Sequence, residues 1–122
     1  SDQEAQDRVF GESGSNRYFF TYIRDVLHRV GILPILKPRP EMSDAECTPE
    51  EILKECVIYG SPKTVLDKLV AFREHVGPFG TLLMTGIDWA GPNKGWEREA
   101  MQLLAQEVMP KFRQHATAHA AE

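Results

Sequence analysis

The sequence has no run that approaches the roughly 20 consecutive apolar residues of a membrane-spanning helix. Nor does it have an excess of basic residues, since 14 Lys and Arg stand against 18 Asp and Glu and the formal net charge is −4. Nucleic-acid backbones and anionic membranes bind proteins through clusters of positive charge. We therefore predict neither a membrane partner nor a nucleic-acid partner.

Cysteine is also scarce. The 122 residues include two, Cys47 and Cys56, which are too few for a disulfide scaffold and lack the C-x-x-C spacing of zinc and redox sites. The first residues, SDQEAQDR, are acidic and polar, whereas a secretory leader is basic and then apolar. We expect a cytoplasmic protein without a metal site, of ordinary globular composition with 42% hydrophobic residues.

The N-terminal part predicts little regular structure. Residues 1–15 contain few groups that could be buried, and GESGS at 11–15 has the composition of a loop, so we predict a flexible segment there. From Asn16 to Val30, apolar residues recur with a period near 3.6, which predicts an amphipathic helix. The residues expected on its buried face are Phe19, Ile23, Val26 and Val30.

A linker and a short helix complete the region 16–55, which we expect to form a lid-like insertion. Pro34, Pro38 and Pro40 interrupt helix and sheet hydrogen bonding, so the linker should be irregular. The run TPEE that begins at Thr48 combines an N-cap residue, a proline at the first helical position and a capping-box glutamate. It predicts a short helix that ends near Glu55.

The region 56–122 has the pattern of a βαβα unit. A β-prone run, Cys56–Tyr59, ends at Gly60 and is followed by a capped helix from Pro62 to Val76. Thr81–Thr85 is apolar on consecutive residues, which predicts a buried parallel strand with both faces covered. In the helix from Pro62 to Val76, the residues expected on the buried face are Val65, Leu69, Phe72 and Val76.

A long helix should begin near Gly95 or Trp96 and be kinked or restarted at Pro110, which has no backbone N–H. Its expected buried face contains Ala100, Leu104, Val108 and Phe112. The two strands of the βαβα unit need more neighbours than this chain supplies. Either further copies complete the sheet, or the chain, which starts at Ser1 without a methionine, is part of a longer parallel α/β protein.

Two successive runs resemble the C-terminal end of bacterial luciferase-like flavin-dependent monooxygenases. They are VIYGSPKTVLDKLVAFREHVGPFGTLLMTGIDW and, after it, WEREAMQLLAQEVMP. In that family a G-[ST]-P turn follows the seventh barrel strand, a G-x-x-x-L-L run forms the eighth, and a helix ending in E-V-M-P closes the barrel. The resemblance covers about Cys56 to Arg113, and more loosely Arg17 to Glu55. It implies the C-terminal βαβα portion of a (β/α)8 TIM barrel, which as a whole needs about 250 residues.

The resemblance also implies a chemistry. Enzymes of this family use reduced FMN, supplied by a separate flavin reductase, to insert one atom of O2 into a small organic substrate, and close relatives use the deazaflavin F420 for hydride transfer. The resemblance places most of the flavin pocket, and the catalytic residues, in earlier strands. We therefore expect an enzyme whose 122 residues alone are inactive, and a homo-oligomer.

Three groups of residues are candidates for cofactor binding. Gly86, Asp88 and Trp89, with Ile87 between them, follow the predicted eighth strand at the barrel end that carries active sites. The alternative is that Asp88 caps the following loop and Trp89 packs between helices. No catalytic residue is identified among the residues of this chain.

Gly60 and Ser61 form the second group, because the N-terminus of a helix can bind an anion. The alternative for them is an ordinary capped turn. Arg17, together with Tyr18 and Lys37, forms the third group as a basic lid, and the alternative for it is a solvated helix start and an exposed linker.

The histidines give weaker signals for a metal site or a catalytic site. His115 and His119 have the i, i+4 spacing of a two-histidine metal clamp but no evident third ligand. His28 and His75 have no nucleophile at a motif spacing. A second function from another class therefore stays open, a non-catalytic assembly module whose copies complete each other's sheets.

Overall fold

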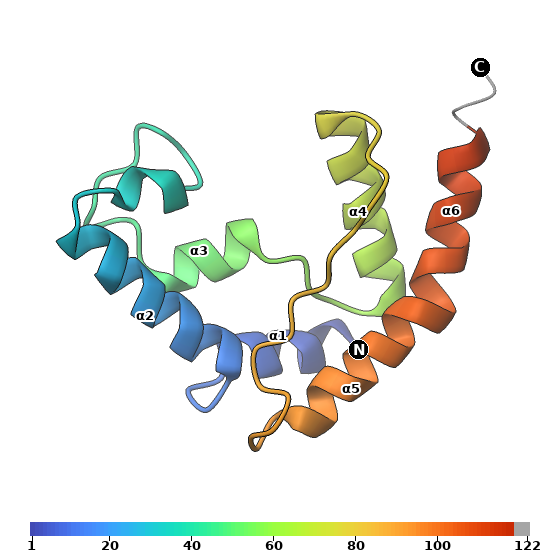
Figure 1. Ribbon diagram of the computed structural model, residues 1–122, viewed down its shortest axis with the longest axis horizontal. Helices are drawn as coiled ribbons and strands as arrows, with labels where there is room; N and C mark the ends of the chain where they lie inside the picture. Colours follow the sequence, from blue (N-terminus) through green and yellow to red (C-terminus); the bar gives the residue numbers. More distant parts are fainter. Residues whose placement is uncertain (119–122) are drawn as a thin grey trace. The chain divides into compact units, whose positions relative to one another are not determined.

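The computed structural model describes residues 1–118. They form two compact units, one of residues 4–57 and one of residues 1–3 and 58–122, of which the last four residues lie outside the description. The first helix, α1 (Asp2–Phe10), crosses the division. Residues 1–15 were predicted to be a flexible segment, and this was wrong for the part that forms α1 (Figure 1).

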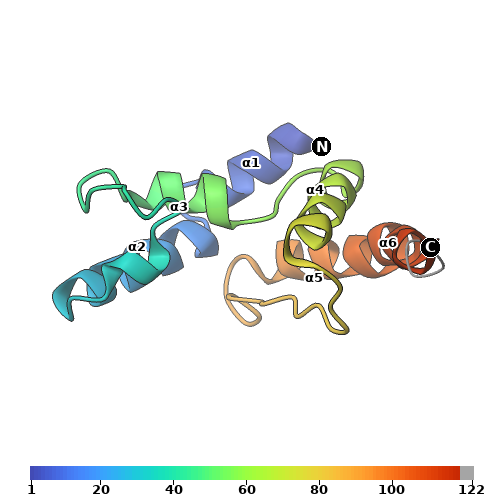
Figure 2. The ribbon, with the colours of Figure 1, turned by 90° about the horizontal axis from the view of Figure 1, so that it is seen from above.

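The unit of residues 4–57 is built on two helices, α2 (Ser15–Arg29) and α3 (Pro49–Cys56), with a short 3-10 turn, η1 (Leu33–Leu36), between them. Figure 2 shows α2 and α3 packed against each other, as their mutual contacts require. Its core consists of Leu33, Met42, Cys47 and Ile52, with Phe20, Leu27 and Leu36 packed around them.

The predicted buried face of α2 was wrong by one position. Phe20 and Leu27 contact the core, whereas Phe19 is 39% exposed and Val30 is 61% exposed. The inner face follows Phe20, Arg24 and Leu27, at spacings of four and three. Arg24 can lie on this face because its guanidinium donates hydrogen bonds to two carbonyls of the linker. Such polar contacts cannot be inferred from the spacing of apolar residues.

The other unit consists of α4 (Pro62–Val76), α5 (Lys94–Leu103), a π-helical turn η2 (Leu104–Val108) and α6 (Met109–Ala118). Its core is Leu69, Val108 and Phe112, and the rings of Phe79 and Phe112 stack with centroids 6.1 Å apart. The bounds of α4 are those predicted. The predicted disturbance near Pro110 is present as η2, and Leu104, Val108 and Phe112 face the core as expected, whereas Ala100 is exposed.

Neither predicted strand is present among residues 1–118. Cys56 ends α3, residues 57–59 belong to no helix or strand, and residues 81–85 run as an unpaired chain between α4 and α5 (Figure 1). Leu83 is 84% exposed, so the expectation that both faces of this segment are covered was also wrong for this chain. A strand requires a neighbour for its N–H and C=O groups, and the described residues supply none.

The two predicted helix caps, Thr48 and Ser61, are present. Thr48 Oγ1 accepts a hydrogen bond from the Glu51 N–H at 3.2 Å, and Pro49 begins α3.

Within residues 1–118, none of the helices has both the length and the apolar content required to cross a membrane.

We expect Thr48→Ala to lower the free energy of unfolding by about 1 kcal/mol, because one N–H of the first turn of α3 loses its acceptor. Urea denaturation followed by far-UV circular dichroism measures this change. Thr81→Ala, at an exposed position outside any helix, is the matched control and should change stability by less than about 0.5 kcal/mol. Equal effects of the two substitutions would contradict the capping role.

Candidate functional site

The loop that precedes α5 contains the candidates Gly86, Asp88 and Trp89, and its shape is set by Glu97. Glu97 Oε1 accepts hydrogen bonds from the backbone N–H groups of Ile87 and Asp88, both at 2.9 Å, and its Oε2 lies 3.2 Å from the Ile87 nitrogen. Glu97 stands in the first turn of α5, where a negative charge is favoured by the helix dipole. The carboxylate therefore ties the end of the extended segment to the start of α5.

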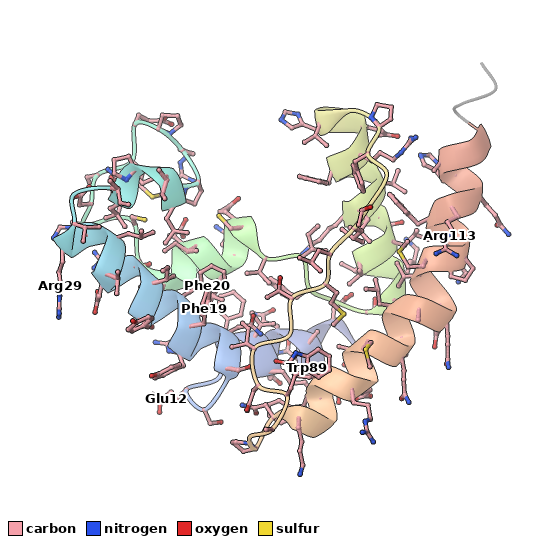
Figure 3. All side chains as sticks on the ribbon, in the orientation of Figure 1. Glu12, Phe19, Phe20, Arg29, Trp89 and Arg113 are labelled. Carbon is pink, nitrogen blue, oxygen red and sulfur yellow. The ribbon has the colours of Figure 1, made fainter. Side chains whose placement is uncertain are left out.

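Trp89 lies against Gly86. The space that a β-carbon on Gly86 would occupy is filled by the indole ring of Trp89, so this position accepts glycine alone without a shift of the ring. Figure 3 shows Trp89 on the loop, and its side chain is 52% exposed. The loop thus presents one aromatic surface that is fixed by its neighbours and still accessible.

Asp88 is engaged with the loop itself. Its Oδ2 accepts a hydrogen bond from the Asn93 N–H at 2.9 Å, and a side chain on Gly91 would collide with its carboxylate. Asn93 is buried, and its carbonyl accepts hydrogen bonds from Trp96 and Glu97 at the start of α5. These contacts agree with the alternative interpretation in which Asp88 closes the loop before the helix.

The turn at Gly60 and Ser61 holds a carboxylate of the same chain. Asp2 Oδ1 accepts a hydrogen bond from the Ser61 N–H at 2.6 Å, and Ser61 Oγ caps α4 by accepting one from the Thr64 N–H. The Ser61 N–H, followed by the hydroxyls of Thr64 and Ser61, lowers the pKa of Asp2 below its ordinary value. Gly60 has φ +142°, which favours glycine.

The predicted anion site at the N-terminus of α4 therefore faces an internal anion. The sequence offered no signal for this contact, because Asp2 and Ser61 are 59 positions apart.

Arg17 belongs to the unit of residues 4–57 and is paired there. Its Nη2 lies 2.6 Å from Glu50 Oε1, and its Nη1 lies 3.4 Å from the Phe10 carbonyl oxygen. A salt bridge of this exposure is worth at most about 1 kcal/mol. Tyr18, next to it in the sequence, is exposed, so the helix start has the solvated character of the alternative interpretation.

Lys37 is also paired. Its Nζ lies 2.7 Å from Asp44 Oδ1, and His28 Nδ1 lies 3.3 Å from Asp44 Oδ2. The hydrogen bond from Lys37 holds the pKa of Asp44 below its ordinary value. The Lys37–Asp44 pair thus joins two parts of the linker, and the contact of Asp44 with His28 ties the linker to the end of α2.

A carboxyl group whose pKa is lower in the folded protein stabilises it above the unfolded pKa of about 4, and this contribution disappears as the pH falls through the folded pKa. We expect Asp44→Asn to remove part of the loss of stability between about pH 5 and pH 2. Chemical denaturation across this range measures it, with Glu12→Gln as an exposed control. An unchanged acid slope in Asp44→Asn would contradict the role of the pair.

The other polar candidates do not gather at one place. His115 Nε2 lies 3.7 Å from Glu74 Oε1 at a shallow groove of about 460 Å³ between α4 and α6, which none of the cofactor-binding candidates lines. His119 lies outside the described residues. Within residues 1–118 no three His, Cys, Asp or Glu side chains are grouped as metal ligands.

The two cysteines differ in accessibility. Cys47 is fully buried, Cys56 is exposed, and desolvation raises the pKa of both thiols.

No family model matches the sequence. The chain is 26% identical over 112 residues to 3,6-diketocamphane 1,6-monooxygenase of Pseudomonas putida, a match that covers 92% of this chain and 29% of that protein.

The structural comparison finds a related protein. The fold matches the oxygenating constituent of 3,6-diketocamphane monooxygenase from the CAM plasmid of Pseudomonas putida, a type II Baeyer-Villiger monooxygenase solved in complex with FMN. The TM-score is 0.74 at 27% identity, over 90% of this chain and 30% of that one. The chain thus spans less than a third of either protein and is homologous to part of a flavin monooxygenase.

Proposed function

We propose that this chain is the C-terminal part of an FMN-dependent luciferase-like monooxygenase and that the loop of Gly86–Trp89 forms one wall of its flavin or substrate pocket. The observation that carries the proposal is the match over 90% of the chain, with a TM-score of 0.74, to an FMN-bound monooxygenase. The remaining walls and the catalytic residues belong to the part of the barrel that this chain does not contain.

The loop fits a flat, uncharged group better than a phosphate. The half-exposed indole of Trp89 offers the kind of surface on which an aromatic ring or an apolar substrate packs. The N–H groups of Ile87 and Asp88 already donate to Glu97, and that of Ser61 donates to Asp2. A phosphate would therefore have to displace a carboxylate of the same chain at either place.

The chemistry follows from the cofactor. When bound and reduced, FMN supplies the two electrons and two protons with which one atom of O2 leaves as water, while the other enters the organic substrate. The residues of this chain contribute one wall of the pocket and exclude water there: Trp89 covers one side, and Gly86 leaves room for the indole ring. The separate reductase returns FMN to its reduced form.

The test uses the intact protein that contains this chain. Its mass is first compared with the 13.8 kDa of the 122 residues, and it is then titrated with FMN and with F420 while the flavin spectrum is followed. We expect FMN to bind, and oxygenated product to form with O2 and a reductase. Binding of F420 alone would favour hydride transfer, and the absence of any flavin binding would refute the proposal.

Gly86→Ala should weaken FMN or substrate binding because the new methyl group displaces the indole. Gly80→Ala is the matched control, since a β-carbon there meets open space. We expect at least a tenfold difference between the two variants, on the order of what a displacement of about 1 Å in a binding wall can cause. Equal affinities would place the loop outside the pocket.

One observation favours the second candidate, assembly. The segment 81–85 is extended and unpaired, with Leu83 exposed, so it can pair with a strand from another copy. Light scattering of the 122-residue chain at micromolar concentration tests this function. A folded monomer would rule out obligate assembly.

A further inference from the structure

We infer that Glu97 is the positioning residue of the proposed pocket wall, and that it restricts that wall to uncharged groups. The inference rests on the proposed function for its pocket, but its first step concerns only the loop. That step is the convergence of two consecutive backbone N–H groups, those of Ile87 and Asp88, on one carboxylate oxygen.

Consecutive N–H groups that point to one place form the kind of concavity that binds phosphates and oxyanions. Here this place is filled by a side chain ten positions later in the sequence, and charge-assisted hydrogen bonds from backbone N–H groups are stronger than neutral ones. Glu97 thus acts as an internal anion. An external anion would have to displace it and leave its negative charge beside the incoming one.

The start of α5, on which Glu97 stands, is held by hydrogen bonds to the loop. The N–H of Glu97 donates to the Asn93 carbonyl at 3.1 Å, and Asn93 is in turn fixed by the bond from its N–H to Asp88 Oδ2. Two sets of hydrogen bonds therefore hold the loop. Glu97 accepts from the N–H groups of Ile87 and Asp88, and Asp88 accepts from the N–H group of Asn93. Between these two sets lies Trp89, whose ring rests on Gly86.

The consequence is a division of roles within the loop. Glu97 holds the backbone on both sides of the turn, Gly86 provides the space, and Trp89 provides the accessible surface. A ligand group at this wall contacts the indole and meets no free N–H of Ile87 or Asp88. The ring system of a flavin or an uncharged part of the substrate satisfies this condition, and a phosphate group does not.

Glu97→Gln is the variant that tests the inference, because it keeps the shape of the side chain and replaces one acceptor oxygen and the charge with an amide. Glu107→Gln, at an exposed position further along the same run of helix, is the matched control. Both are compared with the unaltered intact protein after far-UV circular dichroism has verified the helix content. Glu97→Asp, which retains the charge on a shorter side chain, is the second variant.

The readout is NMR. The α-protons of Gly86 lie against the indole and should show a ring-current shift, which Trp89→Leu identifies by removing it. We expect Glu97→Gln to reduce this shift and to move the Ile87 and Asp88 amide signals, Glu97→Asp to retain part of it, and Glu107→Gln to change neither. If Glu97→Gln leaves all these signals unchanged, the positioning role is refuted.

Two titrations test specificity. Millimolar inorganic phosphate should leave the Ile87 and Asp88 amide signals of the unaltered protein in place, and a saturable shift would refute the exclusion of anions. FMN should bind about tenfold or more weakly to Glu97→Gln than to Glu107→Gln, the range expected for a displaced pocket wall. If the unaltered protein binds no FMN, the proposed function fails, while the Gly86 and amide signals still decide the role of Glu97.

Discussion

Leu69→Ala is expected to lower the free energy of unfolding by about 2 to 5 kcal/mol, the range for removal of a buried leucine side chain. Leu69 is 2% exposed and packs with Val108 and Phe112 where α4 meets η2 and α6. The cost combines the lost apolar burial with the cavity left among partners that relax incompletely. Urea denaturation followed by circular dichroism measures the change.

Leu83→Ala is the matched control, because it is the same substitution at a side chain that is 84% exposed. In the 122-residue chain it should change stability by less than about 0.5 kcal/mol. In the intact protein the proposed barrel would cover Leu83, and the same substitution should then cost about 2 kcal/mol or more. A loss in the chain alone as large as that of Leu69→Ala would contradict the described packing.

Arg24→Met should have the second largest effect, a loss of about 2 to 3 kcal/mol. Arg24 Nε donates to the Cys47 carbonyl at 2.8 Å, and Nη2 donates to the Asp44 carbonyl at 3.0 Å, so one guanidinium holds the end of the linker on α2. Methionine retains much of the apolar stem but supplies no donor, and the Cys47 carbonyl then loses a charged partner.

The rate at which the Cys47 thiol is chemically modified measures how firmly Arg24 holds the linker. This thiol is fully buried, so a thiol reagent should modify the exposed Cys56 first and Cys47 after opening of the unit. Arg24→Met should accelerate modification of Cys47, whereas Arg29→Met, at an exposed position on the same helix, should leave its rate unchanged. Similar rates in the two variants would mean that Arg24 does not hold the linker.

Helices α3 and α4 were predictable because their first residues carry local capping signals, whereas α1 was missed. The side chains of Thr48 and Ser61 accept hydrogen bonds from first-turn N–H groups, and α4 has the bounds expected from its cap and Gly77. Strands depend on partners that are distant in sequence or lie in other parts of a protein. The apolar run at 81–85 therefore indicated a strand, and this chain leaves it extended and unpaired.

The position of the candidate site remains a prediction, and its contacts were only partly foreseen from the sequence. That Gly86, Asp88 and Trp89 form a pocket wall was implied by the resemblance, which places them after the eighth barrel strand, and it stays a prediction. Glu97 was missed because its role depends on a contact with Ile87, which lies ten positions earlier in the sequence. A glutamate in the first turn of a helix that follows a glycine-containing loop was the one signal available.

The π-helical turn η2 has a consequence for the register of the last helix. An α-helix advances by about 100° per residue, so residues four apart drift by about 40° around its axis. A π turn, whose hydrogen bonds span five residues, advances by roughly 80° per residue and reverses this drift. Leu104, Val108 and Phe112 are thereby kept in phase and pack in one core.

One residue of η2 therefore serves as a spacer. Relatives that retain the same core with a continuous α-helix at this place should be one residue shorter there, and loss of Ala105 or Gln106 should be better tolerated than loss of any residue between Val108 and Phe112.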